Sequence, residues 1–374
     1  MRIAINISAS LISTGGEHDN FITKVSRQLI KNHPEHAFIL ISDKELIEKK
    51  ELPENCVIVS AGSKGKNSIT WKWWYAVKIP SILKKHKADI LVSCDGCYSL
   101  RSSISQLVIV TDLSFISFPA FFKKSRVRFL KKNTPKVLKK STLVIASSGF
   151  IKNELIKNYK ITDDKIEVIY GGANENFKPV DDAGKFFTKE KLTDGKEYFL
   201  YSGDIHPVKN LTNLLKAFSI FKKTQQSSMK LVIAGNAAAG YTSFAEKLKD
   251  YKYRNDVVVK NNLTDNETAE IIGAAYAFIN PSFYEGQGTS VLDAMDCHVP
   301  VIASSGSAMQ EIAGDAALFA DPENIPDLAA QMMTIYKDEA LRSRLIEKGK
   351  LIPAQYKCYT SAELLWQSIE NAMG

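Results

Sequence analysis

Apolar positions along the first half of the chain fall into two alternating patterns. Short apolar runs, typical of buried strands, are followed by longer stretches in which apolar residues recur every three or four positions, as on one face of a helix. The runs that predict strands are 2–7, 37–41, 56–60, 89–93, 106–110, 142–146 and 165–169. Strands that alternate with helices form a parallel sheet covered on both faces. The pattern therefore predicts an α/β domain over residues 1–179.

The second half of the chain repeats this pattern. Strands are predicted at 198–202, 231–235, 256–260, 277–280 and 299–303, and helices at 211–223, 270–275, 289–298, 325–337 and 339–351. A chain of 374 residues is too long for one ordinary hydrophobic core, so two domains are expected. We place the second domain at 196–356 and a linker, rich in Asp, Lys and Gly, at 180–195.

A glycine turn between a strand and a helix is the strongest candidate for a binding site. The strand 277–280 leads into a turn with Glu285, Gly286 and Gly288, and the next helix begins at Thr289. Glycines allow a ligand to approach the backbone closely. Because the first N–H groups of a helix have no partner within the helix, they form a natural anion site. The turn therefore predicts a bound phosphate group.

The residues of this turn and of the segment after it resemble the donor-binding signature of retaining glycosyltransferases of family 4, which have the GT-B fold. The matching residues are Tyr284-Glu285-Gly286-x-Gly288, Asp293, Ala294-Met295, Pro300-Val301-Ile302-Ala303, Glu311, Gly314-Asp315-Ala316-Ala317 and Asp321-Pro322. An ordered set of this length is far more specific than a lone glycine turn. The resemblance implies two doubly wound Rossmann-like domains that face a central cleft, with a terminal helix at about 357–374 packed back on the first domain.

The resemblance also implies a nucleotide-sugar site in the second domain. Glu285 would engage the donor sugar, and Asp293, one methylene shorter than the family's usual glutamate, would accept hydrogen bonds from ribose hydroxyls. The residues assigned to donor and nucleotide binding are Gly203, Lys209, Asn210, Gly286, Gly288, Thr289, Ser290, Asp293 and Glu311. The donor is then a UDP- or GDP-sugar, with no cofactor and no metal ion.

A lysine follows the first strand of the second domain. Lys209 lies in loop 203–210, where the resembled family uses a lysine for the donor diphosphate. The family commonly has an arginine at the preceding position, which is Val208 here. His206 could contact the nucleotide, although a histidine in a polar loop is more often exposed. Lys209 is therefore expected to act as the side-chain cation at the diphosphate without the usual neighbour, unless a lysine from the other domain helps.

Two loops of the first domain carry candidates for the acceptor side. Gly15 and Gly16 follow the first strand, and in the resembled family this loop touches donor phosphate or acceptor; a plain glycine-rich turn is the structural alternative. Thr111 and Asp112 follow strand 106–110, where the family has a His-Asp pair. Thr111 can donate a hydrogen bond to a sugar oxygen but cannot titrate near neutral pH. Asp112 either orients the acceptor hydroxyl or caps a turn or helix.

Positive charge is concentrated in one segment. The chain carries a net charge of +8, and residues 123–140 contain nine Lys or Arg and no acid, so the remainder is close to neutral. Apolar residues such as Phe129 and Val137 are interleaved with these charges, which is typical of a basic amphipathic helix on an anionic membrane surface. The alternative is the solvated face of a surface helix. Nucleic acid is not expected as a partner, because no helix-turn-helix, RNP or zinc-finger pattern is present.

The remaining composition indicates a cytoplasmic protein. Apolar residues make up 45% and charged residues 24%, as in soluble globular chains. Five scattered cysteines suit a reducing compartment, and Cys94-x-x-Cys97 alone is a weak metal or redox signal. No apolar run reaches the length of a membrane span, and residues 1–11 resemble a buried strand rather than a secretion signal. We expect any membrane contact to be peripheral, on the inner face. Of the four aromatic residues in 71–75, at least two are expected in the core.

Together these features predict a retaining, metal-independent hexosyltransferase, as the resemblance implies. It would move a hexose from a nucleoside-diphosphate sugar to a glycan or lipid-linked acceptor in surface polysaccharide or lipopolysaccharide synthesis. The residues assigned to catalysis are Glu285, Lys209, Asp112 and Thr111. The chief alternative is a GT-B protein that binds a nucleotide sugar or a partner with impaired catalysis, because Thr111, Val208 and Asp293 depart from the family's pattern. An epimerase or phosphorylase on the same fold lacks motif support.

Overall fold

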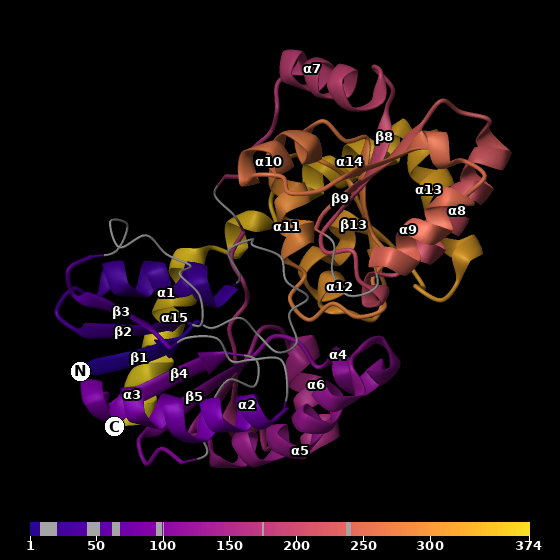
Figure 1. Cartoon of the computed structure of the whole chain (residues 1–374). Helices are drawn as coiled ribbons and strands as arrows, with labels where there is room; N and C mark the ends of the chain where they lie inside the picture. The colour runs from indigo at the N-terminus through magenta and orange to yellow at the C-terminus, as the bar shows by residue number, and fades with distance from the viewer. Residues whose placement is uncertain are drawn as a thin grey trace. The chain divides into compact units, whose positions relative to one another are not determined.

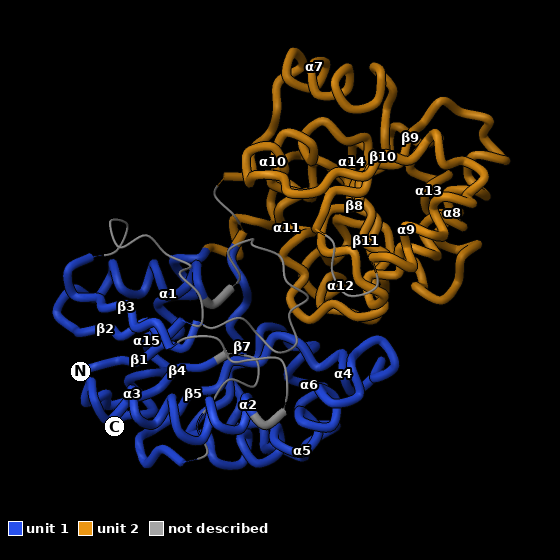
Figure 2. The backbone as a smooth tube through the Cα atoms, viewed as in Figure 1, with its two compact units in different colours: residues 1–13, 19–172, 358–374 blue, residues 14–18, 173–357 orange. Residues whose placement is uncertain are grey.

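The computed structural model describes residues 1–7, 21–42, 53–61, 68–94, 99, 101–173, 176–236 and 241–374 (Figure 1). Their contacts divide them into two compact units (Figure 2). Unit 1 contains the described residues up to 172 together with 358–374, and unit 2 contains those from 173 to 357. The last helix of the chain therefore belongs to the first unit.

A parallel sheet forms the centre of unit 1. Among the described residues its strands lie in the order β3-β2-β1-β4-β5-β6-β7. The bounds are β1 (Arg2–Asn6), β2 (Ala37–Ser42), β3 (Cys56–Ser60), β4 (Ile90–Cys94), β5 (Ser105–Val110), β6 (Leu143–Ala146) and β7 (Ile166–Val168). Ile3 of β1 lies opposite Phe38 on one side and Ile90 on the other, and all three are buried. Burial of consecutive strand positions is what helices on both faces require.

The helices of unit 1 connect these strands. Their bounds are α1 (Phe21–Asn32), α2 (Ser68–Trp73), α3 (Ile79–His86), α4 (Ser114–Ser117), α5 (Lys124–Lys140), α6 (Gly149–Tyr159) and α15 (Cys358–Met373), with a π-helical turn, η2 (Trp74–Lys78), between α2 and α3. Trp71, Trp74 and Tyr75 are buried, whereas Trp73 is 54% exposed. Three of the four aromatic residues of this segment therefore belong to the core, in agreement with the prediction.

The terminal helix α15 packs on α1 and β5 of unit 1. Leu365 and Ile369 are fully buried and share a hydrophobic core with the central strands. The indole ring of Trp366 stacks on the imidazole rings of His33 and His36, with centroid distances of 3.8 and 4.7 Å. The apolar face of this amphipathic helix is therefore buried against unit 1.

Unit 2 has a second parallel sheet, with the order β10-β9-β8-β11-β12-β13 in its described part. The bounds are β8 (Tyr198–Ser202), β9 (Lys230–Ala234), β10 (Val257–Lys260), β11 (Ala277–Asn280), β12 (Val301–Ser304) and β13 (Ala317–Ala320). The helices are α7 (Asp182–Thr193), α8 (Leu211–Gln225), α9 (Tyr241–Lys249), α10 (Asp265–Gly273), α11 (Thr289–Asp296), α12 (Ala308–Ala313), α13 (Ile325–Lys337) and α14 (Glu339–Gly349). Two doubly wound parallel sheets confirm the predicted α/β class.

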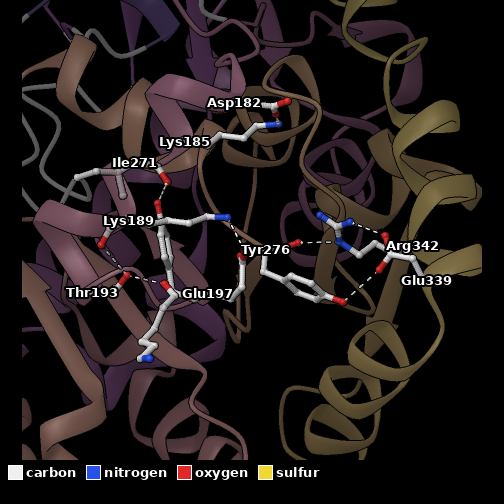
Figure 3. Close-up of polar contacts among 11 residues, drawn as sticks. Asp182, Lys185, Lys189, Thr193, Glu197, Ile271, Tyr276, Glu339 and Arg342 are labelled. Atoms are coloured by element: carbon white, nitrogen blue, oxygen red, sulfur yellow. Dashed lines mark hydrogen bonds and ion pairs between the residues drawn. The ribbon is translucent and has the colours of Figure 1, made fainter. Parts of the chain in front are cut away.

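The segment 180–195, which we expected to form the linker, contains helix α7. The Asp181 side chain caps the start of this helix by accepting a hydrogen bond from Gly184 N–H, and Gly195 follows its end with a φ of +73°. The Lys189 ammonium of α7 lies 2.6 Å from the Glu197 carboxylate just before β8 (Figure 3). Asp181 and Gly195, two of the residues that suggested a linker, thus lie at the two ends of a helix, where these residue types are favoured.

A network of three charged side chains joins three elements of unit 2. Lys222, in the last turn of α8, is 8% exposed and lies 3.0 Å from one oxygen of Asp256, which directly precedes β10. Lys230 of β9 lies 2.9 Å from the other oxygen. Burial raises the pKa of Asp256, but hydrogen bonds and charge from Lys230 and Lys222 outweigh it and bring the pKa below its ordinary value.

Asp256→Asn is expected to lower the free energy of unfolding by about 2 kcal/mol at neutral pH, because a buried lysine loses a charged hydrogen-bond partner. Since the folded-state pKa of Asp256 is lowered, its stabilisation is complete above the unfolded aspartate pKa of about 3.9 and is lost as the pH falls through the folded-state pKa. Urea unfolding of both proteins at pH 7 and near pH 3 measures the difference. Asp315→Asn, which removes the exposed partner of Lys348, is the matched control and should change little. An Asp256→Asn effect of equal size at both pH values would contradict the prediction.

Candidate active site

The loops that leave β8 and β11 lie at the topological switch point of unit 2. The chain runs from β8 to β9 and β10 on one side of the sheet and then crosses to β11, β12 and β13 on the other. β8 and β11 are neighbouring parallel strands, so loops 203–210 and 281–288 leave the sheet at the same edge. Doubly wound sheets bind their ligands outside the carboxyl ends of the strands at such a point. The lysine loop and the glycine turn thus meet where this fold binds ligands.

Lys209 and Glu285 form an ion pair across these two loops. Lys209 Nζ lies 2.7 Å from Glu285 Oε2, and the two side chains are 23% and 15% exposed. A charge-assisted hydrogen bond in such partial burial is stronger than the same pair in water. The structure therefore brings together two of the residues assigned to catalysis, although they are 76 positions apart in the chain.

Backbone hydrogen bonds fix the positions of the two loops. Phe283 N–H donates to the Val208 carbonyl at 2.8 Å, and Ala308 N–H, at the start of α12, donates to the Glu285 carbonyl at 3.0 Å. The Val208 side chain is buried, so this position contributes to packing and supplies no second cation. The ion pair is thus placed by the backbone on both sides.

Asn210, which the sequence assigned to nucleotide binding, braces the same loops. It is buried, and its Nδ2 atom donates to the Pro281 carbonyl at 3.0 Å and to the Pro322 carbonyl at 2.7 Å. Its backbone φ is +60°, a conformation that asparagine tolerates better than most residues. Through these bonds Asn210 fixes the loop that carries Lys209 to the turn after β11.

Helix α11 begins at the glycine turn, and within the described part of the chain no side chain caps its N-terminus. Gly288 stands at the N-cap with a φ of +70°, and a Cβ atom there would lie 3.2 Å from the backbone of Met309. Both the left-handed backbone and the lack of space require glycine. Thr289 and Ser290 follow, half-buried, in the first turn. The positive end of this helix and the Lys209 ammonium are the two fixed positive groups of this edge that the sequence singled out.

Asn280, which was not predicted from the sequence as a site residue, holds this turn in place through side-chain hydrogen bonds. It is the last residue of β11 and is buried. Its Nδ2 donates to Ser290 Oγ at 3.0 Å, and its Oδ1 accepts from the N–H and the hydroxyl of Ser282 at 3.2 and 2.5 Å. A buried polar group needs such partners. An asparagine that ends an apolar strand directly before a proline was the signal that could have found it.

Tyr201 supports the loop after β8 in a similar way. Its buried hydroxyl donates to the Asp204 carbonyl at 2.8 Å, and a Cβ atom on Gly203 would lie 2.9 Å from that hydroxyl. Burial first, and then the negative charges of Glu285 and Asp204, raise the pKa of Tyr201 well above its ordinary value. Tyr201 therefore remains a neutral hydrogen-bond donor, and Gly203 leaves the space that it needs.

His206 is buried, which corrects the expectation of an exposed loop histidine. Its Nδ1 atom accepts a hydrogen bond from Val208 N–H at 3.3 Å and caps the short 3₁₀ turn Pro207–Lys209. The side chain thus helps to present Lys209. The reason for its burial is local, because a capping side chain must fold back over its own turn.

Asp293 and Glu311 lie on the two helices that start at this edge. Asp293 is half-buried one turn after Thr289 on α11, and Glu311 is exposed on α12. Burial and the charge of Glu311 together raise the pKa of Tyr356. The roles of Asp293 and Glu311 toward a nucleotide stay predictions.

In unit 1, Thr111 and Asp112 follow the carboxyl end of β5. Thr111 is buried, and one carboxylate oxygen of Asp112 accepts a hydrogen bond from Ser114 N–H at 2.5 Å, at the start of α4. Asp112 is therefore the turn aspartate that the sequence left open as an alternative, directly before α4. Its role toward an acceptor stays a prediction. Gly15 and Gly16 lie outside the described residues.

The two halves of the chain match two family descriptions. "Glycosyltransferase Family 4" matches residues 19–177, and "Glycosyl transferases group 1" matches residues 182–351. Among curated relatives, O-antigen chain mannosyltransferase B of Escherichia coli is 26% identical over 64% of this chain. The match covers 63% of that enzyme, less than two thirds of its length.

Solved structures share the fold over the whole chain. Sucrose-phosphate synthase from Thermosynechococcus elongatus superposes with a TM-score of 0.81 at 16% identity, over 99% of this chain and 98% of that one. HepE from Anabaena, solved in complex with UDP and glucose, superposes with a TM-score of 0.79 at 15% identity, over 99% and 100% of the two chains. Since a family description matches each unit and the donor-site motif lies at the switch point of the second, this chain belongs to family 4 of the glycosyltransferases and has the GT-B fold.

Proposed function

We propose that this glycosyltransferase moves a hexose from UDP or GDP, with retention of configuration, to a glycan or lipid-linked acceptor during the synthesis of a surface polysaccharide or lipopolysaccharide. The observation that carries the proposal is the Lys209–Glu285 ion pair at the switch point of unit 2. A relative that is an O-antigen chain mannosyltransferase supports the class of product, and a fold relative solved with UDP and glucose supports the class of donor.

The chemical problem in this reaction is the charge of the leaving diphosphate. Lys209 and the uncapped N-terminus of α11 provide fixed positive potential at one edge of the sheet. Groups held in place by backbone contacts need no reorganisation when the charge develops. We propose that these protein groups stabilise the leaving group without a metal ion.

The family resemblance gives the other assigned residues their proposed roles. Glu285 would engage the donor sugar, and Asp293, farther along α11, the ribose hydroxyls. Gly286 and Gly288 would let the backbone of the turn approach the donor, and Glu311 would contact it from α12. On the acceptor side, Asp112 and Thr111 would orient the incoming hydroxyl.

The alternative, a nucleotide-sugar-binding protein with impaired catalysis, draws support from the burial of Val208, which leaves Lys209 without the family's usual neighbour. Both functions require the same donor site, so nucleotide binding does not distinguish them. Transfer or slow hydrolysis of UDP- and GDP-sugars does, because a protein without catalysis gives neither.

UDP or GDP at millimolar concentration is expected to raise the melting temperature, because a ligand that binds the native state alone stabilises it by mass action. Thermal melting with each nucleoside diphosphate measures the shift. Uridine and guanosine, which lack the diphosphate, are the controls and should shift the melt much less. If neither nucleotide changes the melt, the donor-site assignment is wrong.

Lys209→Ala is expected to reduce the rate of transfer by about 10²–10³, the usual cost of losing one group that stabilises developing charge. The fold should remain intact, which circular dichroism and thermal melting test. Lys216→Ala removes an exposed lysine from α8, the helix that follows the same loop, and should keep wild-type turnover. Wild-type turnover by Lys209→Ala would remove this lysine from the mechanism.

We further propose that unit 1 holds the enzyme on an anionic membrane surface through α5. In the described residues, no helix is both long enough and apolar enough to cross a bilayer. The exposed cations of the segment are Lys123, Lys124, Arg128, Lys131, Lys132, Lys136, Lys139 and Lys140. Of the apolar residues between them, Phe129, Leu130, Val137 and Leu138 are buried in the protein and Val127 is half-buried. They cannot enter a membrane as an amphipathic helix would, so the attraction is electrostatic.

A small apolar surface lies on the neighbouring helix. Trp73 and Val77, one turn apart, are 54% and 43% exposed. Their segment packs against α5, where the rings of Trp71 and Phe129 meet edge to face at 5.3 Å. An exposed tryptophan beside a basic surface suits the interface of a bilayer.

The protein is expected to bind vesicles that contain anionic lipid and not neutral vesicles, and added salt should weaken the binding. Each engaged Lys or Arg contributes about 1 kcal/mol, so replacing Lys131, Lys132 and Lys136 by Gln should lower the partition by at least about tenfold. Replacing the exposed Lys216, Lys247 and Lys249 of unit 2 by Gln removes the same charge and is the control. Equal sedimentation with neutral and anionic vesicles would leave α5 as a solvated surface helix.

A further inference from the structure

The Lys209–Glu285 pair presents a conflict for a site that must bind diphosphate. In the structure, the ammonium of Lys209 is 2.7 Å from a carboxylate. A diphosphate brought to the same ammonium would meet the negative charge of Glu285 at close range. Like charges at such distances repel strongly when both are partly removed from water.

We propose that Glu285 is an internal counter-ion of Lys209, and that the donor diphosphate takes the lysine from it and thereby frees the Glu285 carboxylate for the donor sugar. This inference rests on the proposed donor site and deepens it. The diphosphate and Glu285 compete for the Lys209 ammonium, so the Lys209–Glu285 ion pair weakens the binding of the free nucleoside diphosphate.

The surroundings of the pair favour such an exchange. Because the side chains are 23% and 15% exposed, neither charge can be left without a partner at low cost. The backbone of each loop is fixed, by Phe283 N–H on the Val208 carbonyl and by Ala308 N–H on the Glu285 carbonyl. The exchange therefore needs a change of side-chain partner and no movement of the loops.

Buried groups next to the pair hold the two loops without using either charged end. Asn210 connects the lysine loop to the Pro281 carbonyl, and Asn280 connects the end of β11 to Ser290 and Ser282. Tyr201, whose pKa is raised by burial and then by Glu285, donates its hydroxyl to the Asp204 carbonyl. Loss of the carboxylate charge of Glu285 should therefore leave the site assembled.

After transfer the exchange would run in reverse. The product is a nucleoside diphosphate. As it leaves, Glu285 returns to Lys209 and replaces the contact between the diphosphate and the lysine. The pair thus stabilises the empty site and limits how tightly the product is held. Donor binding, in contrast, gains the contact of the freed carboxylate with the sugar.

The test is the affinity of Glu285→Gln for UDP and GDP, measured by calorimetry without any sugar. Glutamine keeps the shape and a hydrogen-bonding oxygen but removes the competing charge, so the variant should bind the diphosphate about tenfold more tightly than the wild type while its turnover falls. A merely structural role of Glu285 would weaken binding. Lys209→Gln should cost more affinity in the Glu285→Gln background than in the wild type, because the Glu285 charge then no longer competes with the diphosphate for the lysine.

Three controls separate the outcomes. Asp182→Asn removes an exposed negative charge from the same unit and should leave the affinity unchanged. Uridine and guanosine should bind Glu285→Gln and the wild type equally. Glu285→Ala gives the same reading if the glutamine variant does not fold. Failure of the wild type to bind either nucleotide would overturn the proposed donor site itself, whereas wild-type binding with equal or weaker binding by both Glu285 variants would overturn the counter-ion alone.

Discussion

The adjacency of β8 and β11 is the constraint on which the candidate site depends. Two parallel strands that are far apart in sequence become neighbours where the winding of the sheet reverses, and their following loops leave at the same edge. That adjacency brings the Lys209 ammonium to 2.7 Å from the Glu285 carboxylate. Hydrogen bonds between the two loops then keep both charges in a partly buried place, where each needs a partner. The glycine turn and the buried Asn210 and Asn280 keep this edge in one arrangement.

The two units use charge in different ways. In unit 2, charges are few at the site and are held by the backbone, so each has a defined partner and a defined position. On α5 of unit 1, the charges are many and exposed, while the apolar side chains of the same helix are buried. Fixed charges suit the stabilisation of one leaving group. Exposed charges of one sign suit attraction to a broad surface of the opposite sign.

Much of the fold could be predicted because its signals are local. Alternating strands and helices appear in the hydrophobic pattern, and the bounds of β3, β8, β11 and α13 match the expected ranges. β13 was missed, since four residues before Asp321 are too few to show a period. Helix α7 within the segment 180–195 was not predicted, because composition does not distinguish the capping residues of a helix from an irregular stretch.

For the site, the sequence by itself determined which residue types stand at the switch point: a lysine after one strand, and a glutamate, glycines and a helix start after another. Those signals are short motifs, which can be recognised in the sequence without a structure. Only the tertiary structure decided that Lys209 and Glu285 form an ion pair. It also decided that the buried Asn210 and His206 side chains hydrogen-bond within the site and that Asn280 supports the glycine turn. Likewise, only packing decided that Phe129, Leu130, Val137 and Leu138 of α5 lie in the core. The physical reason is that pairing and burial depend on which strands and helices become neighbours, and that choice is made by the packing of the whole unit rather than by any one segment.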